Sequence, residues 1–114
     1  MPFKLSKASS YSWPVSCELP IDGGEYETQV FEATFKRKTQ SWITDISKQM
    51  DDDKVTTADV ARELVIGWSG ITDDASKEVP FSQAALDQVL DVPTVAVAIV
   101  SAFFRSVMGV KEKN

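Results

Sequence analysis

The apolar residues over Trp13–Ile21 fall on alternate positions, which constrains the fold more than any other feature of the chain. A period of two is typical of a β-strand with one buried face. Asp22-Gly23-Gly24 then supplies residues suited to a tight turn, and extended character resumes over Glu25–Lys36. The pattern therefore predicts an antiparallel β-hairpin over residues 12–36.

The second half of this hairpin has two competing apolar faces. Tyr26 and Val30 lie on one side of an extended chain, whereas Phe31, Ala33 and Phe35 lie on the other. A β-bulge near Val30-Phe31 would turn both sets inward. The alternative is a strand covered on both faces, and the sequence leaves the two open.

After the basic run Lys36-Arg37-Lys38, the spacing of apolar residues changes to that of helices. Thr39 or Ser41 is suited to cap a first helix. Thr56 begins a second helix with a capping-box pattern, and we expect its apolar face to extend as far as Trp68.

Two further helices are expected after a polar connector over residues 71–79. Ser82 caps the third helix, and the fourth covers Pro93 to Met108. The fourth helix is apolar over most of its circumference, whereas a surface helix normally has an apolar arc only somewhat over 100° wide. This helix is therefore either central to the fold or carries a second apolar face for a partner.

The length of 114 residues is typical of one domain. The patterns together predict a single α+β domain over residues 1–114 that is mainly helical, with an N-terminal β-hairpin followed by about four α-helices. Its helical part covers residues 39–108, and residues 109–114 form a solvated tail.

The residue types needed for most enzyme chemistry are missing. Histidine is absent and Cys17 is the only cysteine, so the commonest metal ligand and the commonest acid/base at neutral pH are lacking. Asp51-Asp52-Asp53 lacks the glycine and glutamate positions of a calcium loop. Asp73-Asp74 are chain neighbours rather than facing carboxylates. We expect no catalytic, metal or cofactor site.

The formal net charge of −5 opposes binding to nucleic acid or to an anionic membrane. Residues 1–50 have equal numbers of acids and bases, so the surplus of acids lies beyond them. The most apolar stretch, Val92–Phe104, is shorter than the roughly 20 residues that span a bilayer. No secretory signal is apparent, which predicts a cytoplasmic protein.

Several short motifs resemble those of the tail assembly chaperones of long-tailed (lambda-like, siphovirus-type) bacteriophages and prophages. One is Phe31-x-x-x-Phe35 followed by the basic run. The others form a tryptophan, an acidic turn, a Pro-aromatic-Ser segment and a hydrophobic helix: Gly67–Asp74, Val79–Ser82, Ala85–Pro93 and Phe103-Phe104.

The resemblance implies a non-catalytic protein of the host bacterial cytoplasm that is not in the mature virion. Such chaperones bind the tape measure protein, keep it soluble and help to recruit tail tube subunits. In many relatives a frameshifted longer form recruits the tube protein, and the members self-associate. From composition and placement, we select Trp68, Phe103 and Phe104 as candidate protein-binding residues.

An alternative function is a small acidic phage or bacterial inhibitor that occupies the basic, nucleic-acid-binding surface of a partner. The chain has 17 acidic residues, enough for charge mimicry. Mimics tend to spread carboxylates along a helix face, whereas the acids here cluster in connectors. That distribution favours the chaperone.

Overall fold

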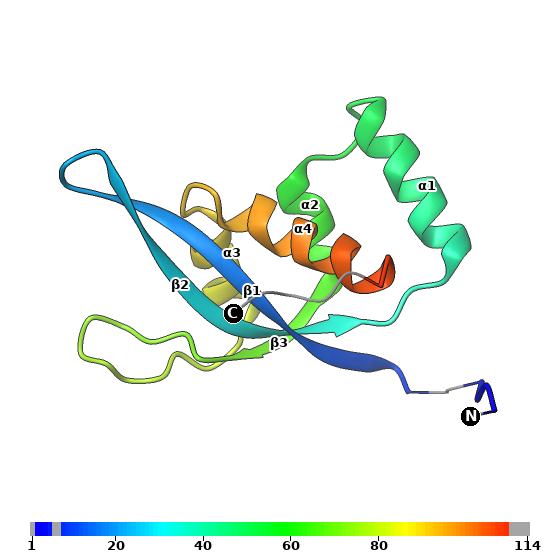
Figure 1. Ribbon diagram of the computed structural model, residues 1–114, viewed down its shortest axis with the longest axis horizontal. Coiled ribbons are helices and arrows are strands. Elements are labelled where there is room, and N and C mark those ends of the chain that lie inside the picture. Colours follow the sequence, from blue (N-terminus) through cyan, green and yellow to red (C-terminus); the bar gives the residue numbers. More distant parts are fainter. Residues whose placement is uncertain (1, 6–7, 110–114) are drawn as a thin grey trace.

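A long twisted β-hairpin forms the frame of the molecule (Figure 1). The computed structural model describes residues 2–5 and 8–109. Strand β1 (Ser10–Ile21) pairs with β2 (Glu25–Lys36) without interruption, and Gly23 and Gly24 take positive φ angles in the turn. The predicted hairpin is confirmed and begins two residues earlier than expected.

The two faces of the hairpin differ sharply in burial. Phe31, Ala33 and Phe35 of β2 are buried, whereas Tyr26 and Val30 are exposed on the opposite face. The β1–β2 register contains no bulge. Both alternatives for this strand are therefore wrong, because its second apolar set faces solvent.

A third strand completes the sheet, in the order β1-β2-β3. Helix α2 (Thr57–Leu64) stops where β3 (Val65–Ser69) begins, and β3 pairs with Glu32–Phe35 of β2. The expectation of a helix reaching Trp68 is therefore wrong. A β-branched pair followed by glycine favours a strand over a helix, and β2 offers that strand a partner.

The helix starts follow the capping residues closely. Helix α1 (Gln40–Asp51) is capped by the Thr39 side chain, and the capping box of α2 joins Thr56 and Asp59. Ser82 caps α3 (Gln83–Leu90). Helix α4 (Val95–Val107) begins two residues later than expected, after Thr94.

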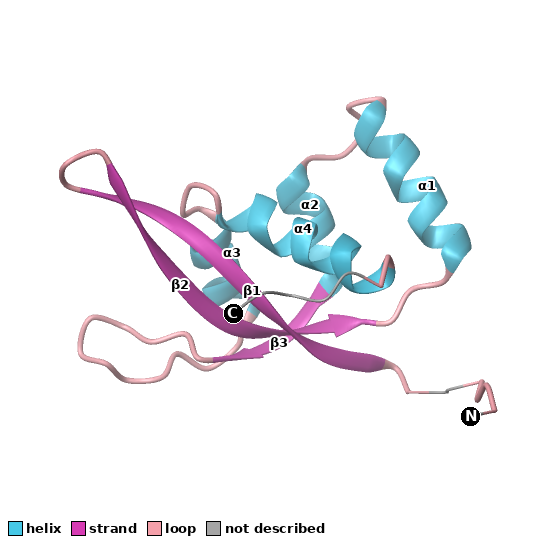
Figure 2. Ribbon diagram, in the orientation of Figure 1, coloured by secondary structure: helices cyan, strands magenta, loops and turns pink. Residues whose placement is uncertain are grey.

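Helices and strands contribute comparably to the fold (Figure 2). Among the described residues, helices take 39% and strands 29%, so the α+β class is confirmed but "mainly helical" is wrong. The predicted tail covers residues 109–114, and all of it except Gly109 lies outside the described residues.

Helix α4 is central to the core. It packs against β1, α2 and α3, and it contributes more buried side chains than any other helix. Those side chains are Val95, Ile99, Val100, Ala102 and Phe103. The central position accounts for much of the apolar circumference of this helix.

Helix α1 stands apart from the rest of the domain (Figure 1). Its only buried residue is Ile46, and Trp42 reaches the core with its ring edge-to-face against Phe103, 6.1 Å between centroids. A few side chains therefore hold this helix in place.

Candidate functional site

The outer side of α4 borders an open hollow of about 420 Å³. The end of α1, the start of α2 and α4 itself form its walls. We call it the α4 hollow; its lining residues are Met50, Thr57, Val97, Val100, Ser101, Phe104, Arg105 and Met108. The second alternative for this helix, an apolar face beyond the core, therefore also has a structural basis.

The lining of the α4 hollow is mostly apolar and partly solvent-exposed. Val97 is 59% exposed and Met108 is 72% exposed, and Phe104 is half-buried and packs against the core. Methionine side chains adapt to irregular partners because they are flexible and polarisable. This surface is suited to contact with an apolar segment of another protein.

Phe103 is a core residue. It is fully buried, and its ring packs edge-to-face on both Phe35 and Trp42, with the Phe35 centroid 5.6 Å away. A side chain with no exposed surface contacts no partner while the domain is folded. Phe103 therefore supports the α4 hollow from inside.

Trp68 has a structural role in β3. Its indole N–H donates a hydrogen bond of 2.8 Å to the carbonyl of Val79, and its ring packs edge-to-face on Phe81. These contacts close the loop that links β3 to α3. Trp68 is half-buried and does not line the α4 hollow.

Of the three residues selected from the sequence, only Phe104 lines the α4 hollow. Val97 and Met108 belong to the apolar circumference that the sequence predicts for the fourth helix, although neither was selected as a binding residue. Met50 comes from α1, and no local signal connects it with α4. Only the tertiary packing of α1, α2 and α4 brings the residues of the hollow together.

The ionisable groups considered from the sequence as chemical candidates have structural surroundings. Burial raises the pKa of the Cys17 thiol, which keeps it protonated and poorly nucleophilic at neutral pH. Asp73 accepts hydrogen bonds from the backbone N–H groups of Ala75 and Lys77 at 2.8 and 3.0 Å, so it shapes its loop. Within residues 2–5 and 8–109, no group of three acidic or cysteine side chains is placed to hold a metal ion.

No single helix in the described part of the chain is long and apolar enough to cross a membrane. Helices α3 and α4 reach that length only together, and they are bent by 103° relative to each other.

Comparison with protein-family models, with curated proteins and with solved structures finds no match to this chain. A functional argument therefore depends on the residues of the chain itself.

Proposed function

We propose that this protein is a non-catalytic phage tail assembly chaperone, which binds the tape measure protein and keeps it soluble. The observation that carries the proposal is the α4 hollow, an open and mostly apolar surface on the central helix. The motifs around Trp68 and Phe103-Phe104 resemble those of tail assembly chaperones, and this resemblance is the reason for proposing the tape measure protein as the client.

A chaperone of this kind requires apolar surface rather than catalytic groups. It must cover apolar segments of its client and later release them, so its contact area has to be modest. An amphipathic client helix laid against α4 would place apolar side chains in the hollow at helical spacing. Met50 and Met108 can adjust to different side chains along a long client.

The same proposal covers the later steps of tail assembly. Tail tube subunits displace the chaperone from the tape measure protein, with a frameshifted longer form recruiting them. The protein then acts in the host bacterial cytoplasm and leaves before the virion is complete. Its net charge of −5 opposes non-specific aggregation through the apolar surface.

Co-expression with the tape measure protein of the same phage or prophage tests the proposal. The wild-type chain is expected to move the tape measure protein into the soluble fraction and to co-purify with it. Phe104→Asp and Met108→Asp place a carboxylate in the hollow and are expected to abolish both effects. Ile66→Asp is the matched control, because Ile66 is an exposed apolar residue outside the hollow.

Two results would overturn the proposal. The first is a tape measure protein whose solubility does not depend on this chain. The second is equal activity of the hollow variants and the wild type, with circular dichroism showing that all are folded.

A further inference from the structure

The turn end of the hairpin projects beyond the helices (Figure 1). We call residues Glu18–Gln29 the arm; all of them are exposed except Leu19, which is half-buried. Because β3 pairs only with Glu32–Phe35, no strand in the described part of the chain lies beside the rest of β2 on the side away from β1. The arm therefore has a free strand edge, able to accept a further strand.

The charge of the arm is all of one sign. Glu18, Asp22, Glu25 and Glu27 lie on it, and no lysine or arginine occurs between residues 8 and 35. The arm is therefore acidic, although residues 1–50 as a whole have no net charge, because the lysines and arginines of that range lie outside the arm. A strand that binds here is favoured if it is basic.

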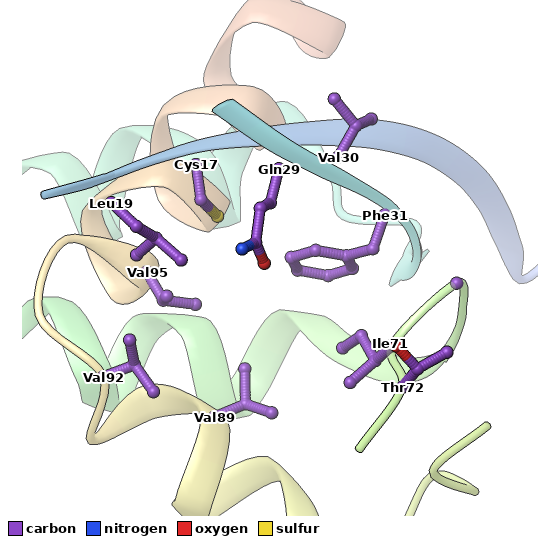
Figure 3. Close-up of a pocket in the computed structure, with 11 residues that line it drawn as sticks. Cys17, Leu19, Gln29, Val30, Phe31, Ile71, Thr72, Val89, Val92 and Val95 are labelled. Atoms are coloured by element: carbon purple, nitrogen blue, oxygen red, sulfur yellow. The ribbon is translucent and has the colours of Figure 1, made fainter. Parts of the chain in front are cut away.

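An apolar groove, which we call the arm groove, lies at the base of the arm, where Leu19 and Gln29 line it together with neighbouring residues of the hairpin. Figure 3 shows Gln29, Cys17, Leu19 and Phe31 above a floor that includes Val92. Its volume is about 170 Å³. An apolar cavity of about 150 Å³ is large enough to hold benzene, so this groove has room for one phenyl ring.

The N-terminal segment of the chain has the complementary chemistry. Phe3 is 90% exposed and Leu5 is 83% exposed, with Lys4 between them and Lys7 close behind in the sequence. Apolar and basic residues therefore alternate over Phe3–Leu5, and residues 2–5 are exposed and add nothing to the core. Residues 2–5 lie at the opposite end of the long axis from the hairpin turn (Figure 1), and that axis measures 47 Å.

We propose that the N-terminal segment of one copy binds the arm of a second copy. Its backbone pairs with the free edge of β2, Phe3 occupies the arm groove, and Lys4 and Lys7 bring positive charge to the arm carboxylates. The binding segment and the arm are different surfaces at opposite ends of the molecule. The contact is therefore head-to-tail, and its repetition builds chains or closes into rings. The proposal does not depend on the chaperone function.

Mixing two single variants tests this arrangement directly. Phe3→Asp removes the donor segment, and Val92→Arg blocks the groove at a residue that is partly exposed. Each variant alone is expected to sediment as a monomer under conditions where the wild type forms larger species. An equal mixture is expected to form dimers and nothing larger, because it contains only one working donor and one working acceptor.

A charge exchange provides the second arm of the test. Glu25→Lys with Glu27→Lys is expected to weaken association by about tenfold or more, since close charge pairs contribute strongly to binding. Lys4→Glu with Lys7→Glu is expected to do the same alone and to restore association when mixed with the first double variant. Added salt is expected to weaken the wild-type association.

Three outcomes would overturn the proposal. They are a wild-type chain that stays monomeric at every concentration, a Phe3→Asp variant that associates like the wild type, and a mixture of donor and acceptor variants that stays monomeric. A symmetric interface through another surface would give the second outcome. Circular dichroism of each variant verifies that the fold is retained.

Discussion

The rings of Phe103 and Phe104 lie 5.5 Å apart between centroids, yet Phe103 is fully buried and Phe104 borders the α4 hollow. Adjacent residues of a helix differ in direction by about 100°, which is enough to separate the core side of α4 from its outer side. The pair therefore connects the stability of the domain with its proposed binding surface.

Phe103→Ala and Phe104→Ala are expected to separate these two roles. Phe103→Ala leaves a cavity among Phe35, Trp42 and Phe104, which typically costs about 3–5 kcal/mol for a buried phenylalanine. Phe104→Ala removes a half-buried ring and is expected to cost about 1–2 kcal/mol. Urea denaturation, monitored by circular dichroism, measures the loss of stability in each variant. Equal losses would contradict the assignment of the two residues.

Trp42→Ala is expected to release α1 while the rest of the domain stays folded. Trp42 joins this helix to Phe103, and the Lys38 ammonium lies 4.6 Å from the centre of its ring. Segments with few buried contacts open locally at low free energy. Hydrogen exchange measured by mass spectrometry should show faster exchange in α1 but unchanged exchange in α4. Thr44→Ala, on the exposed side of α1, serves as the control.

The helix starts and the hairpin turn were predictable because their signals are local. Thr39, Thr56 and Ser82 each accept a hydrogen bond from a backbone N–H three residues ahead, so a short stretch of sequence contains the whole interaction. The turn at Gly23 and Gly24 is local in the same sense.

Strand β3 and the α4 hollow were not predictable, because each depends on partners distant in sequence. Val65 and Trp68 continue the apolar spacing of α2, which competes with the strand preference of Val65-Ile66-Gly67, and the pairing with β2 favours the strand. The hollow similarly requires Met50, at the end of α1, to lie at the same surface as the residues of α4. Phe103 and Phe104 look alike in the sequence, and the packing of α4 alone decides which is buried.

The capping box of α2 is expected to make stability depend on pH. The hydrogen bond from the Thr56 backbone N–H lowers the pKa of the Asp59 carboxyl below its usual range. A carboxyl with a lowered pKa in the folded state stabilises that state above its unfolded pKa, and the contribution is lost as pH falls through the folded pKa. Asp59→Asn cannot titrate, so its stability deficit at neutral pH is expected to vanish in acid. Urea midpoints of both proteins at several pH values measure this, and a deficit independent of pH would contradict it.

Thr94 connects the α3–α4 turn to the hairpin. Its hydroxyl donates a hydrogen bond of 3.1 Å to the carbonyl of Glu18, and its φ angle of 76° is unusual for a β-branched residue. Thr94→Val removes the hydrogen bond but keeps the shape, with an expected cost of about 0.5–1.5 kcal/mol. Thr94→Ser retains the hydroxyl and is the matched control. Thermal unfolding compares the two, and equal midpoints would show that the hydrogen bond contributes nothing.

Two glycines around β3 are expected to respond in opposite ways to alanine. At Gly67 the backbone lies outside the left-handed region, and an added Cβ would meet Thr34 at an ordinary distance of 3.5 Å. Gly67→Ala is therefore expected to stabilise the domain by about 0.4–1 kcal/mol, because alanine restricts the unfolded chain. At Gly70 an added Cβ would also find room, 3.6 Å from the nearest atom of Phe31, but φ is 87°. Gly70→Ala is then expected to cost about 1 kcal/mol or more through backbone strain alone. Denaturation of the two variants isolates that strain, since the space around the added methyl group is similar at the two positions. A gain in stability for Gly70→Ala would contradict the positive φ angle at this residue.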